Sequence, residues 1–411
     1  MISIDGFRAE DLAHPDEAGI HVPRLQALAE DGVEARAVIN VAPTLTYPNH
    51  TTLMTGVAPA VHGIIANQRF DPEGVLRNSV YWYAREIAVP TLWDAVHRSG
   101  GKVANVYWPV AVGSRSIDIN FPELWAGGQS KDWPLIAAVS NVEALDPADR
   151  HAPRAALERL IAPTTAGDSA RVDLALSLFA HEHPSLLTVH LVSLDETQHH
   201  LGIRSNEKRR AIDALDTMVG RLIDGARAVD RTVRFVIVSD HGQVPLSYEV
   251  NLGTLLTGAG LTTTGSGWRA AIWNVDSAYL VIRTGDKAAQ AAAMQALTRY
   301  AANSSSAIDR IVPMDRPIPD RADGHIAAMV FFKAGYAAGN TTTGPLITPA
   351  KNRGQHGGSP DDPGLRSMFI AQGAGVPKRG SLGIVDMRAI APTVAKMLDV
   401  PMPSAPEAPL F

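Results

Sequence analysis

Apolar and polar positions along the chain alternate in blocks that predict strands and helices in turn. Short and mainly apolar runs predict strands at residues 2–4, 102–108, 185–193 and 233–239. Between them, apolar residues spaced three or four apart predict helices at residues 22–31, 89–101, 169–181 and 206–228. This alternation favours a doubly wound α/β fold, in which helices cover both faces of a mostly parallel central sheet.

The pattern changes in the second half of the chain, where polar loops separate the elements. Strand patterns at residues 278–285 and 327–335 flank a helix pattern at residues 288–303. We expect residues 246–354 to form a small inserted α+β subdomain. The main core then comprises residues 1–245 and 355–411, with a strand at 366–373 and a last helix at 387–400.

Composition narrows the functional classes. The 411 residues carry a net charge of -5, so the chain has no basic surface of the kind that binds nucleic acid. The absence of cysteine excludes disulfides and thiolate ligands, and it leaves His and carboxylate groups to bind any transition metal. No apolar run reaches the length of a membrane span. No pattern indicates a particular oligomeric state.

Three acidic residues follow predicted strands. Asp5, Asp195 and Asp240 each come just past the carboxyl end of an apolar run. Because ligands gather at the carboxyl ends of strands in doubly wound sheets, we expect the three carboxylates to lie together. Any one of them alone is more typical of a helix cap. Crowded carboxylates raise one another's pKa unless a cation neutralises them, so the set indicates bound divalent ions.

Three histidines accompany these acids. His199 lies four residues after Asp195, a spacing that places both on one face of a helix. His241 follows Asp240 directly, and His356 stands in the glycine-rich run GQHGG. The six side chains together suit two zinc-type ions with nitrogen and oxygen ligands. We interpret other histidines near these motifs as structural, namely His62, His190 and His200.

Five stretches, in this order along the chain, carry a resemblance to a known family. They are ISIDGFR (2–8), PTLTYPNHTTLMTGVAPAVHGIIAN (43–67), SLDETQHH (193–200), VSDHGQV (238–244) and GQHGGSPDDPGLRSMFIAQG (354–373). Their combination resembles the nucleotide pyrophosphatase/phosphodiesterase family (type I phosphodiesterases) of the alkaline phosphatase superfamily. The resemblance implies an alkaline-phosphatase-like fold and two bound zinc ions, with manganese or another divalent ion as an alternative.

The resemblance also implies roles for individual residues. Thr46, the second threonine of PTLTYPNH, matches the covalent nucleophile, whereas Thr44 does not. Asn67 matches the residue whose amide, with the backbone of Thr46, holds a phosphate oxygen. Tyr47 matches an aromatic residue that stacks on a nucleoside base or leaving group, with plain core packing as the alternative.

The expected metal ligands form two groups in the family pattern. One zinc site is matched by Asp195, His199 and His356. The other is matched by Asp5, Asp240 and His241, with Thr46 bridging toward it. The implied reaction passes through a phospho-threonine intermediate that water then hydrolyses. A nucleoside triphosphate would give a nucleoside monophosphate and pyrophosphate.

Departures from the family pattern leave the substrate open within the class of small phosphate esters, of which nucleotides are the expected ones. Leu45 stands where Lys is frequent, and Gly357-Gly358 where Gly-Tyr is frequent. A phosphomonoesterase is the main alternative, because Lys351 and Arg353 form a Lys-x-Arg pair just before His356. A phosphonate hydrolase and a phosphate-transferring mutase are further ones. A non-catalytic metal-binding protein is disfavoured, because nucleophile, amide and six ligands are all intact.

The start of the chain bears on its location. MISIDG enters the first predicted strand at once. Either a leader was removed from this numbering, which implies a periplasmic or secreted protein, or the protein is cytoplasmic with a short first strand. The family resemblance slightly favours the first alternative.

Overall fold

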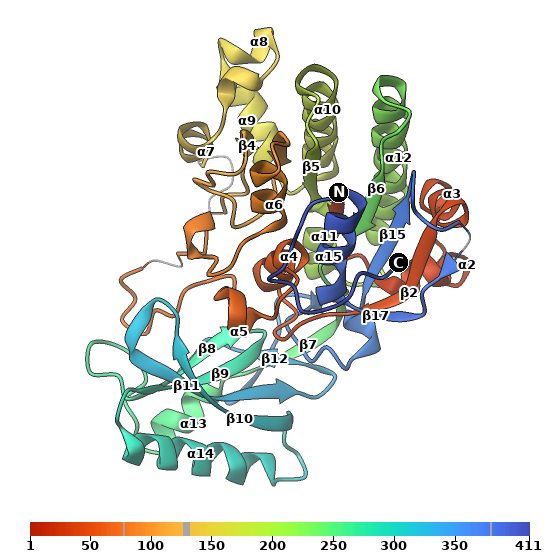
Figure 1. Ribbon diagram of the computed structural model, residues 1–411. Coiled ribbons are helices and arrows are strands. Elements are labelled where there is room, and N and C mark those ends of the chain that lie inside the picture. The colour runs from red at the N-terminus through yellow and green to blue at the C-terminus, as the bar shows by residue number, and fades with distance from the viewer. Residues whose placement is uncertain (77–78, 126–131, 379) are drawn as a thin grey trace.

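A nine-stranded sheet forms the centre of the computed structural model, which describes residues 1–76, 79–125, 132–378 and 380–411 (Figure 1). Its strand order is β16-β2-β15-β6-β1-β5-β3-β4, and β17 also pairs with β2. The strands are β1 (Ile2–Ile4), β2 (Val33–Ile39), β3 (Val103–Val106), β4 (Ile119–Phe121), β5 (Leu186–Leu191), β6 (Phe235–Val238), β15 (Ser367–Gln372), β16 (Gly380–Ser381) and β17 (Ile384–Asp386). Among the described pairings of this sheet, only those of β15 are antiparallel. The expected mostly parallel sheet is confirmed.

Helices cover both faces of this sheet, as the residues of β6 illustrate. Phe235 and Ile237 join one apolar cluster, whereas Val236 and Val238 join another, because successive side chains of a strand point to opposite faces. The first cluster includes residues of α3 (Pro23–Asp31), α10 (Thr165–Glu182) and α12 (Asn206–Val229). The second includes residues of α4 (Thr46–Thr55), α6 (Leu92–Arg98) and α15 (Ile390–Met397). Helices therefore cover both faces of the sheet, and the predicted doubly wound arrangement is confirmed.

Further helices connect these elements. They are α1 (Ala9–Ala13), α2 (Pro15–Ala18), α5 (Pro59–His62), α7 (Trp133–Val139), α8 (Pro147–Arg150), α9 (Pro153–Ile161) and α11 (Ser193–Leu201). No helix in the described parts of the chain combines the length and the apolar character that crossing a membrane requires.

A second, antiparallel sheet has the order β10-β11-β9-β8. Its strands are β8 (Ala270–Val275), β9 (Ser277–Arg283), β10 (Ile308–Ile318) and β11 (Arg321–Phe332). One apolar cluster joins it to α13 (Leu252–Gly258) and α14 (Lys287–Ala301). Another joins it to residues around α4, including Leu45, Tyr47 and Ile64. This sheet therefore supports the segment that carries Thr46.

The sequence pattern predicted β9, α14 and part of β11 but missed β8 and β10. Strand β10 is an edge strand that contains Pro313 and Pro317, and most of its side chains are at least partly exposed. Prolines are tolerated at sheet edges, yet they make such a segment look like a loop in the sequence.

A third, small sheet links the inserted segment to the core. In it, β7 (Val244–Val250) pairs with β12 (Gly335–Ala338), β13 (Ile347–Pro349) and β14 (Gly354–Gln355). Gln355 lies opposite Val244, so the residues that follow β14 lie close to the residues that precede β7. The expected insert, 246–354, begins inside β7 and ends inside β14. Its behaviour as a separate subdomain stays a prediction.

A buried ion pair between Asp168 and Arg171 anchors the start of α11. Both side chains are fully buried near the start of α10. The Asp168 carboxylate accepts the N–H groups of Val192 at 2.9 Å and of Ser193 at 3.0 Å. Arg171 donates to the carbonyl oxygen of Ala162 at 2.9 Å. This pair therefore fixes the junction between β5 and α11.

We expect Asp168→Ala to lower the free energy of unfolding by about 3–5 kcal/mol, because it leaves Arg171 as a buried charge without its partner. Asp173→Ala is the control, since Asp173 lies exposed on the same helix. It should change the same quantity by less than about 1 kcal/mol. Urea unfolding followed by circular dichroism measures both, and equal losses would contradict the anchoring role.

Candidate active site

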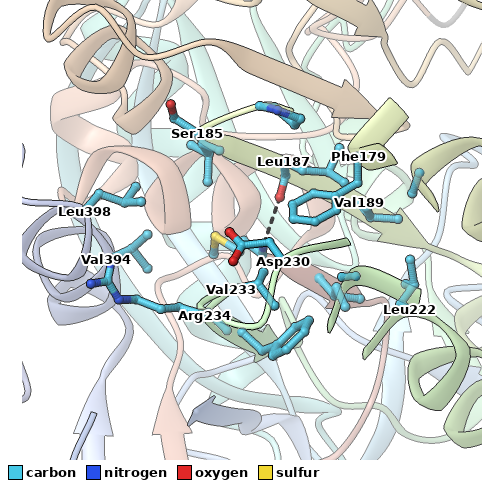
Figure 2. A pocket seen from close by; sticks show the side chains of 18 of the residues that line it. Phe179, Ser185, Leu187, Val189, Leu222, Asp230, Val233, Arg234, Val394 and Leu398 are labelled. Carbon is cyan, nitrogen blue, oxygen red and sulfur yellow. Dashed lines mark hydrogen bonds between the residues drawn. The ribbon is translucent and has the colours of Figure 1, made fainter. Parts of the chain in front are cut away.

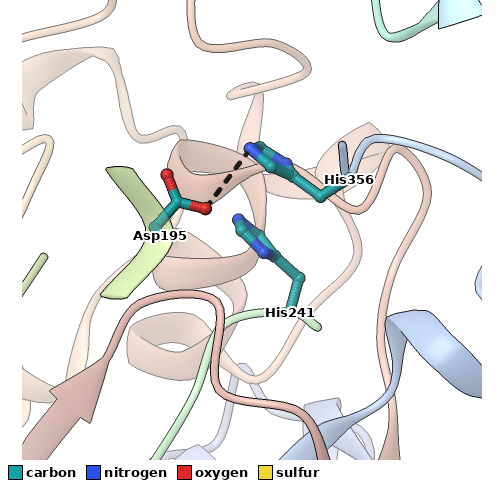
Figure 3. Close-up of side chains that lie close together, drawn as sticks. All are labelled: Asp195, His241 and His356. Carbon is teal, nitrogen blue, oxygen red and sulfur yellow. Dashed lines mark ion pairs between the residues drawn. The ribbon is translucent and has the colours of Figure 1, made fainter. Parts of the chain in front are cut away.

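The carboxyl edge of the central sheet brings the expected metal ligands together. Asp5 follows β1 and Asp240 follows β6, and these two strands are neighbours. Asp195 lies in the first turn of α11 rather than directly after β5, which ends at Leu191. His356 follows β14. Two groups of ligand atoms each lie within 4.8 Å of one another: Asp5, Asp240 and His241, and Asp195, His241 and His356 (Figure 3).

His241 belongs to both groups. Its Nε2 lies 3.0 Å from Oδ2 of Asp240 and 3.5 Å from Oδ1 of Asp5. Its ring stacks on that of His356, with the ring centres 3.7 Å apart. His199 lies outside the compact groups, although its Nε2 is 3.3 Å from Oδ2 of Asp195. The expected division of the ligands, with His199 beside Asp195, therefore stays a prediction.

The protein holds the carboxylates of Asp5 and Asp240 through one oxygen each. Oδ1 of Asp240 accepts the N–H groups of His241 at 2.9 Å and Gly6 at 3.2 Å. Oδ2 of Asp5 accepts from Nε2 of His190 at 3.0 Å. The remaining oxygens, Oδ1 of Asp5 and Oδ2 of Asp240, are buried and accept no hydrogen bond of good geometry, although Nε2 of His241 lies 3.5 Å from the first and 3.0 Å from the second. Because such burial costs free energy, these orphaned oxygens fit a bound cation.

The imidazoles of His199, His241 and His356 all turn Nε2 toward the carboxylates, because Nδ1 is held by the backbone. The Nδ1 atoms lie 3.0, 3.2 and 3.0 Å from backbone carbonyl oxygens, in the pairs His199–Gly354, His241–Gly242 and His356–Thr44. A carbonyl oxygen only accepts, so Nδ1 donates, and in the neutral ring Nε2 keeps a free lone pair. Histidines that bind metals are oriented by this kind of second hydrogen bond.

Without a cation, the centre holds protons in its place. Burial, with the charges of Asp240 and Asp195, raises the pKa of Asp5 well above its ordinary value. Burial acts to lower the pKa of His199, but the charge of Asp195 raises it to about 10. Against the same effect of burial, the charge of Asp240 raises the pKa of His241 to about 9. Burial and the neighbouring charge of His241 instead lower the pKa of His356 to about 3, so positive charge is favoured on His199 and His241 and not on His356.

Thr46 begins helix α4 beside the metal-ligand groups. Its Oγ1 lies 3.4 Å from Nε2 of His241. The first N–H groups of a helix lack partners within it, and they attract anions such as phosphate. Oδ1 of Asn67 accepts the N–H of Tyr47 at 2.9 Å, which leaves the NH₂ group of that amide to donate elsewhere. A hydroxyl, an amide and a helix N-terminus thus gather at one point.

Tyr47 lies in the protein interior. Only 2% of its surface is exposed, and it packs in the cluster that joins α4 to the second sheet. Its hydroxyl donates to Oε1 of Glu123 at 3.2 Å. Packing alone explains this position, so the stacking role inferred from the family resemblance stays a prediction.

Lys351 and Arg353, the basic pair that favours a phosphomonoesterase, lie close to His356 in the sequence. The N–H of Arg353 donates to the carbonyl oxygen of His199 at 2.7 Å. The side chains of Lys351 and Arg353 are exposed. This arrangement keeps the alternative open.

Several residues near the centre had no role in the sequence analysis. Gln243 donates to the carboxylate of Asp195 and stands in the motif VSDHGQV, where its spacing could have indicated a contact. Nδ1 of His50 lies 2.9 Å from the carbonyl oxygen of Thr46. Asp276 sits between β8 and β9 with φ 62°, and burial raises its pKa to about 6. Asp276 lies in no sequence motif. It reaches the site only through the folding of the second sheet.

An apolar cavity of about 260 Å³ lies at the opposite edge of the central sheet (Figure 2). Residues from the starts of β1, β5 and β6 line it, together with Phe179, Val394 and Leu398. Its lining contains none of the expected site residues.

The sheet and the acid–imidazole groups at its carboxyl edge define an alkaline-phosphatase-like α/β protein. A family model described as type I phosphodiesterase / nucleotide pyrophosphatase matches residues 1–359. The chain belongs to this family, whose members are hydrolases.

Curated relatives show the same likeness over part of their length. Human ectonucleotide pyrophosphatase/phosphodiesterase family member 1 is 29% identical over 254 residues, which cover 59% of this chain and 23% of the human protein. An uncharacterized pyrophosphatase/phosphodiesterase of Schizosaccharomyces pombe is 28% identical over 252 residues, or 60% of this chain and 45% of that protein. The chain therefore spans less than half the length of these relatives.

Solved structures share the fold. Human ectonucleotide pyrophosphatase/phosphodiesterase 5 matches with a TM-score of 0.67 and 20% identity, covering 97% of this chain and 94% of that chain. The murine protein matches with a TM-score of 0.67 and 19% identity, covering 98% and 94%. That murine structure is an inactive threonine-to-alanine variant in complex with AMP.

We expect binding of a divalent metal ion, with zinc as the probe, to release protons at pH 7.5. The pKa values of about 9 for His241 and about 10 for His199 mean that both rings are protonated in the metal-free protein, whereas a ligand nitrogen must be deprotonated. Zinc affinity should therefore rise with pH by about tenfold per pH unit for each displaced proton, until pH passes these pKa values. Calorimetric titrations in buffers of different ionisation enthalpy measure the release. Binding without proton release would contradict this charge assignment.

Proposed function

We propose that the chain is a metal-dependent phosphodiesterase/nucleotide pyrophosphatase with Thr46 as its nucleophile. The observation that carries this proposal is the position of Thr46 at the start of α4, with its Oγ1 3.4 Å from a histidine shared by two groups of ligand atoms. Family membership and the threonine variant of the murine neighbour support it.

Two divalent ions, zinc in the first instance, complete the proposed site. Asp195, His199 and His356 would hold one ion, and Asp5, Asp240 and His241 the other. When bound, the ions would lower the pKa of the Thr46 hydroxyl and offset the negative charge of the substrate. Manganese is the alternative, since oxygen-rich sites also accept it.

The reaction then requires two displacements at phosphorus. In the first, the Thr46 hydroxyl gives up its proton and Oγ1 forms a bond to phosphorus, while the leaving oxygen departs with the electron pair of its bond and is protonated from solvent, which gives a phospho-threonine. In the second, water attacks from the opposite side, the bond to Oγ1 breaks, and the Thr46 hydroxyl is restored. Two in-line displacements retain the configuration at phosphorus.

Asn67 would stabilise the charge that develops on phosphate. Its Oδ1 is occupied by the N–H of Tyr47, so its NH₂ group is the part able to donate to a non-bridging oxygen. The backbone N–H of Thr46, at the N-terminus of α4, would donate to the same oxygen. Such preorganised donors are worth about 10²–10³ in rate in characterised enzymes.

Nucleotides are the proposed substrates: the nucleoside phosphate would be held on Thr46 as a phosphodiester, and water would release it as a nucleoside monophosphate. The AMP in the murine neighbour supports this choice. Curated relatives include ectonucleotide and venom phosphodiesterases, which supports a periplasmic or secreted location.

We expect Thr46→Ala to abolish turnover of a nucleotide diester while AMP binding persists, because the change removes the attacking oxygen and leaves the ligands intact. Thr44→Ala is the matched control: Thr44 is also buried, and its hydroxyl donates to the carbonyl oxygen of Gly358 at 3.2 Å. Thr44→Ala should retain most of the turnover.

Stopped-time assays with zinc-loaded protein measure turnover, and calorimetry measures AMP binding. Turnover by Thr46→Ala at the level of the Thr44→Ala control would exclude Thr46 as the nucleophile.

A further inference from the structure

Buried polar side chains form a continuous chain from Asp5 to the first turn of α4. Nε2 of His190 lies 3.0 Å from Oδ2 of Asp5, and Nδ1 of His190 lies 3.0 Å from Oε2 of Glu123. The other oxygen of Glu123 accepts the hydroxyl of Tyr47 at 3.2 Å. The four residues come from the ends of β1 and β4, from β5 and from α4, so the contacts cross four elements.

The hydrogen bonds of this chain define the role of each group. A carboxylate only accepts, so His190 donates from both ring nitrogens, to Asp5 on one side and to Glu123 on the other. Nδ1 also lies 3.2 Å from the carbonyl oxygen of Tyr107. The ring is fully buried and lies 4.3 Å, centre to centre, from that of His50. His190 therefore has little freedom to rotate away from Asp5.

Glu123 stands in the middle of this series of hydrogen bonds, between His190 and Tyr47. Its exposed fraction is 9%, and its two oxygens contact different elements. Packing does not require a carboxylate at this depth, because an apolar residue of similar volume is often at least as stabilising as a buried charge pair. A positioning role explains why a charged side chain occupies this buried position.

We propose that Glu123 is a positioning residue that holds both a metal ligand and the nucleophile-bearing helix. Through His190 it fixes Oδ2 of Asp5, so that the orphaned Oδ1 faces the metal centre. Through the hydroxyl of Tyr47 it ties the turn that carries Thr46 to the same point. This inference rests on the proposed metal centre, because Asp5 needs orienting only if it binds an ion.

Glu123→Gln tests the inference, because an amide presents one acceptor oxygen in place of two. The amide can accept from His190 and donate its NH₂ group to the hydroxyl of Tyr47, but it is neutral, so it loses the charge-assisted hydrogen bond with which Glu123 holds His190. The measurement is the affinity of the metal-free protein for each of two zinc equivalents, by competition with a chromogenic chelator. Glu34→Gln is the control, since Glu34 is a partly buried glutamate on β2, away from this chain. The melting temperature of the metal-free proteins reports on folding.

We expect Glu123→Gln to weaken one zinc equivalent by about 10–100-fold, as substitutions behind metal ligands do. The other equivalent and the Glu34→Gln control should stay unchanged. His190→Gln should weaken the same equivalent, and the double variant should show no further loss, because Glu123 acts on Asp5 through His190. If Glu123→Gln does not fold, His190→Gln alone must still weaken one equivalent selectively.

The contrary outcomes are distinct. Unchanged zinc affinity in both variants would overturn the inference and leave the proposed function intact. Equal weakening of both equivalents, together with a lower melting temperature of the metal-free protein, would show that Glu123 only stabilises the fold. A wild-type protein that binds no divalent ion would overturn the metal centre and the inference together.

Discussion

The architecture depends on the crowding of three carboxylates at one edge of the sheet. Asp5, Asp195 and Asp240 come from different elements and lie in a region where burial disfavours their charges. Coulomb repulsion between such groups is strong unless positive charge lies between them. The imidazoles of His199 and His241 supply that charge in the metal-free protein, and Oδ1 of Asp5 and Oδ2 of Asp240 still accept no hydrogen bond of good geometry. The same arrangement provides the ligand set that divalent ions prefer.

The rest of the fold serves to hold this edge. The Asp168–Arg171 pair fixes the start of α11, which carries Asp195 and His199. Pairing of β14 with β7 places His356 against His241. The second sheet packs against residues around α4 and supports Thr46. Segments from all parts of the chain therefore converge on one small volume.

Periodicity in the sequence predicted the strands β1, β3, β5, β6 and β15 and the long helices that cover them, and the motifs identified acids and histidines that the structure brings together. Buried parallel strands are continuous apolar runs, and acids at their ends lie together by topology alone. The positions of Glu123 and Asp276 beside the site could not be predicted, because neither lies in a motif and tertiary packing alone brings them there. Tyr47 does lie in a motif, but the motif does not indicate that its ring is buried. Strand β10 was missed because its prolines and charges are typical of loops.

The proposed hydrolysis of phosphodiester bonds by Thr46 and its neighbouring ligand groups can be measured by comparing kcat/KM of zinc-loaded protein for bis-p-nitrophenyl phosphate and p-nitrophenyl phosphate. We predict a higher kcat/KM for the diester. A higher value for the monoester would contradict a phosphodiesterase and would indicate that Lys351 and Arg353 bind a dianionic phosphate.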